Sequence, residues 1–168
     1  MEHDIKFELI LNTDTETVWK KWTTREGMMS FFAPEAAVDL EIGGRYELYF
    51  DPQAPAGEKG AEGMKILAIE DKKLLSFTWN APTTYPEIRR QRTCVCIRIE
   101  DLDEGKTRLI LENTGYGYSR EWQEALEYFR IAWGNVVLPR LKYSIEDGPV
   151  DWNDRKSLEK YYLYHKYP

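Results

Sequence analysis

Residues suited to acid–base or metal chemistry are few in this chain of 168 residues. Its two histidines, His3 and His165, stand near opposite ends of the sequence, so no Ser-His-Asp or Cys-His arrangement is indicated. Cys94 and Cys96 alternate with Val95 and therefore share the outer face of a predicted strand. A zinc site there would need two more ligands. We expect no catalytic residue, no metal and no cofactor, and two free surface cysteines.

Asn113 is a polar residue at a position where the strand pattern predicts an apolar one. It follows Leu109 and Leu111 on the inward face of a predicted strand, and Tyr116 comes shortly after it. Burying its amide without partners would cost about 1–3 kcal/mol. Backbone, a tyrosine hydroxyl or water would satisfy it in a purely structural role, and a bound ligand would satisfy it in a functional one. The sequence leaves both open.

Aromatic residues make up 14% of the chain and include 6 Trp and 11 Tyr. Trp79 lies on a predicted strand, and Phe129 and Trp133 lie on a predicted helix that faces it. Any one of them is readily explained as core, since aromatic stripes at helical spacing usually pack there. The set favours a pocket, because Gly134 beside Trp133 and a kink at Pro139 would prevent close contact along the whole helix.

We therefore predict a ligand-binding pocket between sheet and helix. Its predicted lining consists of Phe31, Phe32, Tyr46, Leu48, Trp79, Asn113, Tyr116, Phe129, Trp133 and Val137. Phe31, Phe32 and the Pro/Gly-rich loop 51–61 would lie near its mouth. The loop is either a gate or a plain mobile connection, and the sequence favours neither.

The elements that must position these residues begin with a strand at residues 5–11. Thr13 and Glu16 form a predicted capping box that opens a helix with Val18, Trp19 and Trp22 on one stripe. Three hairpins follow, and the alternation of apolar and polar residues along their strands predicts a sheet with one apolar face. Their strands are predicted at 36–42 and 44–51, 63–70 and 73–80, and 91–101 and 106–114. A short helix at 24–32, stopped by Pro34, separates the first helix from these hairpins. Together with the first strand they predict a seven-stranded antiparallel sheet.

A long amphipathic helix begins at the N-cap candidate Ser119 and ends near Gly148. It is long enough to lie across the apolar face of the sheet. We expect one domain over residues 1–148 and a tyrosine-rich extension over 149–168. The extension is either a docked helix or an interaction arm, and association into a homodimer is left open.

Charge and hydropathy exclude some partners. The formal charge of −6 argues against a nucleic-acid binder, which needs a basic surface. No apolar run approaches the length of a membrane span, so membrane insertion is not expected. Two cysteines and an N-terminus without a signal-peptide pattern indicate the cytoplasm.

The order strand, two short helices, six antiparallel strands and long helix is that of the α+β helix-grip fold. The stretches "TDTETVWKKWTTREGMMSFF", "VDLEIGGRYEL", "EGMKILAIEDKKLLSFTW", "TRLILENTGY" and "AWGNVV" resemble the Hsp90 ATPase activator homologue-like family. This family is part of the START/polyketide-cyclase (SRPBCC) superfamily. The resemblance covers roughly residues 5–145 and implies a curved sheet gripping the helix, with a cavity that in relatives holds lipids, sterols, polyketides or hormones. Relatives often carry Trp where Phe31 stands and His where Asn113 stands.

Three functions are compatible with these observations, in decreasing order. The first is a module that binds an apolar or amphipathic small molecule in the cavity. The second is a protein-interaction domain resembling co-chaperones. The third is a cyclase or hydrolase that polarises a carbonyl with cavity tyrosines and Asn113, and the scarcity of ionisable cavity residues weighs against it.

Overall fold

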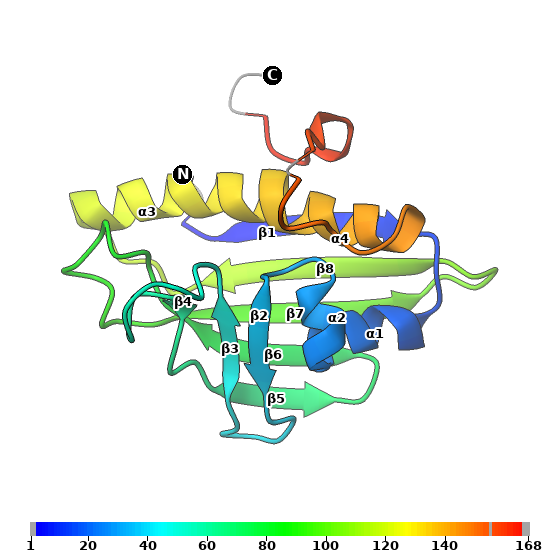
Figure 1. Cartoon of the computed structure of the whole chain (residues 1–168), viewed down its shortest axis with the longest axis horizontal. Coiled ribbons are helices and arrows are strands. Elements are labelled where there is room, and N and C mark those ends of the chain that lie inside the picture. The colour runs from blue at the N-terminus through cyan, green and yellow to red at the C-terminus, as the bar shows by residue number, and fades with distance from the viewer. Residues whose placement is uncertain (1–2, 155, 166–168) are drawn as a thin grey trace.

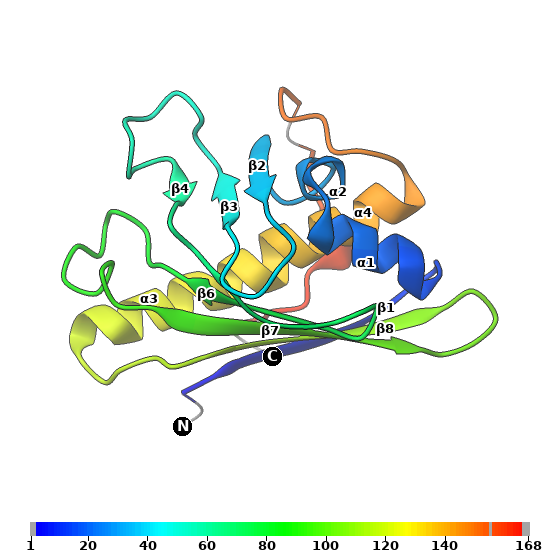
Figure 2. The same cartoon turned by 90° about the horizontal axis from the view of Figure 1, so that it is seen from below.

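The computed structural model describes residues 3–154 and 156–165. A long helix lies across a sheet of long strands, and a small group of shorter strands packs on the same side of that sheet (Figures 1 and 2). The predicted α+β class with a large antiparallel sheet and a long C-terminal helix is confirmed.

The prediction of one seven-stranded sheet is wrong. The described residues form a five-stranded antiparallel sheet in the order β1-β8-β7-β6-β5 and a three-stranded sheet in the order β2-β3-β4. The large sheet consists of β1 (Ile5–Leu11), β5 (Ile66–Glu70), β6 (Leu74–Trp79), β7 (Thr93–Asp101) and β8 (Thr107–Thr114). The small sheet consists of β2 (Glu35–Val38), β3 (Tyr46–Tyr49) and β4 (Gly60–Ala61).

The division arises at residues 39–45. The strands on either side, β2 and β3, pair as the predicted hairpin, but the loop between them is longer than the predicted connection at residue 43. Gly43 adopts a φ of 82°, and its amide donates to the carbonyl of Ile66 at the start of β5. An isolated bridge between Arg45 and Lys65 continues this link between the sheets. Beyond it β3 turns away from the large sheet and pairs with β2 and β4. Alternation along these strands reports which face is buried but not which neighbour each strand takes.

Two helices connect β1 to the small sheet: α1 (Thr15–Thr23) and α2 (Arg25–Met29). The N-cap of α1 is Asp14 rather than the predicted Thr13. The Asp14 carboxylate accepts the amide proton of Thr17 at 2.8 Å. Hydrogen bonding from Thr17, by its side chain first and then by its amide, lowers the pKa of Asp14. The stripe of α1 points inward as predicted, with Val18, Trp19 and Trp22 buried.

The long helix comprises α3 (Arg120–Ile131), a π-helical stretch η1 (Ala132–Val137) and α4 (Leu138–Glu146). The predicted N-cap is confirmed, since the Ser119 hydroxyl accepts from the amide of Trp122. The helix continues through Pro139, which lies in the first turn of α4. Pro139 lacks an amide proton, and the wider turn just before it, closed by Leu138 N–H to Trp133 C=O, accommodates that loss.

The chain after the long helix folds back onto the domain. The Trp152 indole donates to the Met29 carbonyl at 2.8 Å, and the amide of Leu163 donates to the Gly134 carbonyl. The side chain of Asn135 bonds both the amide and the carbonyl of Tyr164. Over residues 149–154 and 156–165 the predicted extension is therefore docked, with one short 3₁₀ turn, η2 (Glu159–Tyr161). Residues 166–168 of that prediction lie outside the described residues. No helix in residues 3–154 and 156–165 has the length and apolarity needed to cross a membrane.

Candidate functional site

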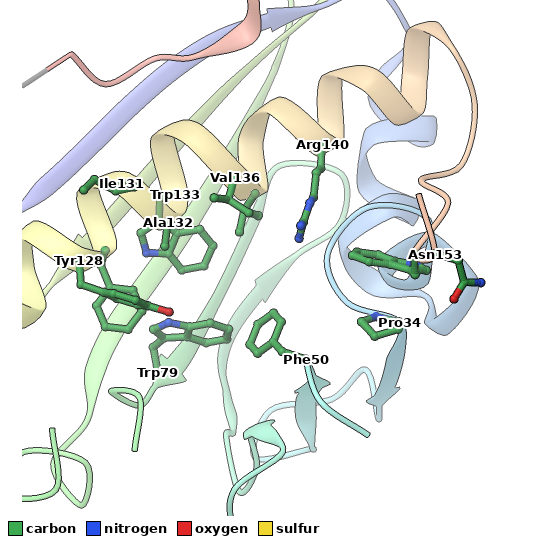
Figure 3. A pocket seen from close by; sticks show the side chains of 13 residues that line it. Pro34, Phe50, Trp79, Tyr128, Ile131, Ala132, Trp133, Val136, Arg140 and Asn153 are labelled. Carbon is green, nitrogen blue, oxygen red and sulfur yellow. The ribbon is translucent and has the colours of Figure 1, made fainter. Parts of the chain in front are cut away.

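A groove with a cavity volume of about 550 Å³ opens beside the long helix, on the side that faces the small sheet. Figure 3 shows side chains of the helix above it and Trp79 and Phe50 below it. The groove is lined by Pro34, Phe50, Trp79, Tyr128, Phe129, Ile131, Ala132, Trp133, Val136, Val137, Arg140, Trp152 and Asn153.

The long helix supplies most of this lining because residues three and four apart share one face. Phe129, Trp133, Val136 and Arg140 follow that spacing. Opposite them stands Trp79, the last residue of β6, and Phe50, the residue after β3, closes the floor. Trp152 lines one end of the groove, and the hydrogen bond from its indole to the Met29 carbonyl holds it in place.

The walls are aromatic and their rings contact one another. The ring centroids of Trp79 and Trp133 are 5.2 Å apart, and those of Phe50 and Trp79 are 6.4 Å apart. Phe32 stacks behind Trp79 at 5.7 Å and contacts Trp133 edge-on. Rings held in this way offer a flat apolar surface that needs little reorganisation when a molecule binds.

Of the ten residues predicted for the pocket, the structure brings four to the groove: Trp79, Phe129, Trp133 and Val137. The other six do not line it and are buried elsewhere: Phe31, Phe32, Tyr46, Leu48, Asn113 and Tyr116. Phe31 and Phe32 pack against Trp22, away from the surface. Tyr46 stacks on Phe77 at 4.1 Å, and its hydroxyl donates to the Trp22 carbonyl.

Asn113 is satisfied entirely by protein groups, which resolves the two interpretations of its role. Its amide nitrogen donates to Thr93 Oγ1 and to the Cys94 carbonyl, each at 3.0 Å. Its amide oxygen accepts from Tyr116 Oη at 2.6 Å and from Trp133 Nε1 at 3.1 Å. Burial raises the pKa of Tyr116, which keeps that hydroxyl a donor. Asn113 thus joins sheet to helix and is not positioned to polarise a bound carbonyl.

The groove itself carries a few polar atoms. Trp79 is 4% exposed, and its indole nitrogen has no hydrogen-bond partner among the described residues. Tyr128 contributes a phenol whose pKa is raised by burial and by the nearby Tyr85. Figure 3 shows the Arg140 side chain reaching down from the helix into the groove, with its nitrogens at the tip. The arrangement offers donors inside apolar walls.

Nine of the thirteen lining residues were absent from the sequence-based prediction, and three of these nine carried a clear signal. Phe50 shares its strand face with Tyr46 and Leu48, and Arg140 follows Trp133 and Val136 at helical spacing. Tyr128 neighbours Phe129 on the same helix. Trp152 carried none, because it enters the groove only through the return of the chain after the helix.

The loop 51–61 borders a second hollow rather than the mouth of the main groove. This hollow, of about 210 Å³, shares Phe50, Trp79, Tyr128 and Phe129 with the groove. Arg89 ties the loop to the rest of the fold by donating to the carbonyls of Gly57 and Ala81. The expected gating by this loop stays a prediction.

The sequence predicts that the two cysteines are free and lie on the outer surface of the sheet. Cys94 and Cys96 are free thiols, both half-buried, and burial raises the pKa of Cys96. Among the described residues no three His, Cys, Asp or Glu side chains gather as metal ligands would. A role for the thiols does not follow from their contacts.

Fold and groove together define a helix-grip domain of the START-like class. The model of the Activator of Hsp90 ATPase homolog 1-like family matches residues 12–144, which is most of the chain. The protein belongs to this family, within the SRPBCC superfamily, as the sequence resemblance indicated. No curated protein matches the sequence significantly.

Solved structures of similar fold come from several organisms. An HSP90 activator from Plasmodium falciparum superposes with a TM-score of 0.65 at 17% identity, covering 88% of this chain and 97% of its own. Protein MLL2253 from Mesorhizobium loti gives 0.64 at 20% identity, with coverages of 85% and 93%. CalU16 from Micromonospora echinospora gives 0.64 at 19% identity, with coverages of 87% and 67%. At these identities the likeness establishes the fold alone.

Proposed function

We propose that this protein binds one apolar or amphipathic small molecule in the groove beside the long helix. The observation that carries the proposal is the lining of the groove: an open cavity of about 550 Å³ with aromatic walls, whereas hollows of similar size elsewhere on the described surface are lined mainly by charged and polar side chains. Sites for small organic ligands commonly measure about 300–1,000 Å³ and are lined by apolar and aromatic side chains with few polar groups.

Two further features support a ligand here. Large apolar side chains are exposed at the groove, namely Phe50, Tyr128 and Ile131, and leaving such groups in water is unfavourable unless something covers them. The indole N–H of Trp79 is buried in the wall and has no partner in the part of the chain that the structure describes, and an acceptor on a bound molecule would satisfy it.

A variant that fills the groove tests the proposal. Ala132 lines it, so Ala132→Phe would place a ring in the cavity without removing any core contact. Titration with the neutral fluorophore N-phenylnaphthylamine should give saturable binding to the wild type and a loss of about tenfold or more in affinity for Ala132→Phe. Gln123→Phe adds the same ring at an exposed position of the same helix and should bind as the wild type does.

Native mass spectrometry of the freshly purified protein complements the titration by detecting a co-purifying small molecule and the subunit count. Absence of saturable binding to the wild type, or equal binding by Ala132→Phe and Gln123→Phe, would refute the groove as a ligand site. Detection of a dimer would answer whether the chain associates with a second copy of itself.

A second candidate function is interaction with a protein, as in co-chaperones. It is favoured by exposed Ile42 and Leu67, whose segments are joined by the hydrogen bond from the amide of Gly43 to the carbonyl of Ile66, and by exposed Leu40 in the same loop as Ile42. Because one structural relative is described as an HSP90 activator, the test is the ATPase rate of a purified Hsp90 chaperone. Stimulation that is lost in Ile42→Lys and kept in Ala132→Phe would support this function over the first.

Location and organisation complete the proposal. Two free cysteines fit a reducing cytoplasm, where we place the protein. We treat residues 1–148 as the ligand-binding domain and 149–168 as an extension, with Trp152 of the extension contributing to the groove. Catalysis would require an acid–base group facing the ligand. The described lining offers the phenol of Tyr128, whose pKa is raised by burial, and no His, Asp or Glu, so a cyclase or hydrolase activity is the least supported alternative.

A further inference from the structure

The charge at the groove is concentrated on one residue. Among the thirteen described residues that line it, Arg140 is the one with a charged side chain. Its guanidinium carbon lies 5.0 Å from the centroid of the Trp152 ring, and Figure 3 shows the side chain directed into the groove. The apolar cavity therefore has a cationic end.

The position of this cation is fixed from outside the groove. Trp152 is held by its indole bond to the Met29 carbonyl at 2.8 Å, and the amide of neighbouring Val150 donates to the Ser30 carbonyl. The guanidinium lies against the Trp152 ring at cation–π distance. A guanidinium carries its N–H donors in one plane, a geometry that suits two-point binding of a planar or tetrahedral anion.

The distribution of acids explains where such an anion would lie. No Asp or Glu is among the described lining residues of the groove. Asp151 and Asp154 instead border a smaller hollow of about 100 Å³ that shares Arg140 and Trp152 with it. An anionic group inside the groove would meet Arg140 without facing a lining carboxylate, next to aromatic walls that suit an apolar body.

We infer that the ligand of this groove is an amphipathic anion, an aromatic or polycyclic body bearing a carboxylate or similar acidic group that binds Arg140. This inference rests on the proposed function and specifies its ligand class. The body would lie along Trp79, Phe129 and Trp133, with its acidic end toward Trp152.

Two fluorophores with the same aromatic body separate this inference from the proposed function. Anilinonaphthalene sulfonate carries an anionic group, and N-phenylnaphthylamine is its neutral counterpart. The chain has a formal charge of −6, so without a local cation the sulfonate should bind more weakly than the neutral probe. We expect the opposite order in the wild type.

Arg140→Met should reduce sulfonate affinity about tenfold, which is the usual effect of losing a charge-assisted hydrogen bond, and should change neutral-probe affinity little. Arg140→Lys, which keeps the charge but not the planar fork, should fall between. Arg120→Met removes the same charge from an exposed site of the same helix, so it controls for long-range electrostatics and should bind both probes as the wild type does.

Each outcome discriminates. Equal loss, or no loss, of both probes in Arg140→Met would overturn the anionic ligand while leaving the groove as a binding site. Failure of both probes to bind the wild type would remove the proposed function as well. Near-UV circular dichroism shows whether Arg140→Met folds. If it does not, the affinities of the wild type for the two probes are compared instead, and tighter binding of the neutral probe than of the sulfonate would overturn the inference.

Discussion

The long helix has two contrasting sides. Toward β1, β7 and β8 the space is filled: Asn113 joins Trp133, Tyr116 and Thr93 in one hydrogen-bonded cluster, and Phe7 packs against Gly134. Toward the small sheet the same helix faces an open groove, lined by Arg140 and by Trp79, whose indole N–H has no partner in residues 3–154 and 156–165. Trp133 belongs to both sides, with its N–H in the cluster and its ring at the groove. The contrast teaches that one helix can hold the fold together and leave room for a ligand at once.

Breaking the filled side should have the largest effect on stability. Asn113→Leu would leave the buried donors of Tyr116 and Trp133 without an acceptor, at about 1–3 kcal/mol each, so we expect a loss of about 3 kcal/mol in the free energy of unfolding. Urea titration measures it. Adding Tyr116→Phe removes one orphaned donor and should restore about 1 kcal/mol.

The same variants bear on the groove. The fraction of Asn113→Leu that remains folded should bind N-phenylnaphthylamine with the affinity of the wild type, because Asn113 does not line the groove. A variant of undiminished stability that no longer binds the probe would reverse the roles assigned to the two sides.

Added volume should be tolerated differently on the two sides. A methyl group at Gly134 would lie 2.7 Å from Cζ of Phe7 and 2.8 Å from Cβ of Tyr164, so Gly134→Ala should destabilise the fold by about 1–2 kcal/mol despite the better helix propensity of alanine. Ala132→Leu adds three carbons on the open side and should cost less than about 0.5 kcal/mol. Thermal and urea unfolding of the pair supply the comparison, and a larger cost for Ala132→Leu would contradict an open groove.

Two tryptophans give a smaller and finer comparison. Trp79 and Trp133 are both buried and in contact, but only the indole of Trp133 donates a hydrogen bond among the described residues. Trp133→Phe should therefore destabilise the protein by about 1 kcal/mol more than Trp79→Phe does. Equal losses in urea unfolding would mean that the Asn113 bond contributes little, and the cluster would then be a weak joint between helix and sheet.

The sequence predicted the large sheet well because alternation in β6, β7 and β8 is regular and their hairpins are short. It did not predict the separation of β2, β3 and β4, since pairing partners depend on the turn at residues 39–45 and on a single bridge at Arg45. Helical spacing sufficed to place Phe129, Trp133 and Val137 at one site.

Two features of the groove do not follow from the apolar pattern of the sequence. Arg140 continues the helical spacing of Trp133 and Val136, but it is charged and therefore does not belong to an apolar stripe. A polar residue on an apolar strand was assigned to the pocket, whereas Asn113 finds four protein partners. Trp152 reaches the groove through tertiary folding of the extension, which no local pattern in the sequence encodes.

Methyl resonances report on both sides of the helix in one experiment. In a titration with N-phenylnaphthylamine followed by methyl NMR, the account predicts saturable shifts for Ile131, Val136 and Val137, which line the groove, and none for Val95 and Leu111 on the filled side. Shifts centred on Val95 and Leu111, or no saturable shift at the groove, would contradict it.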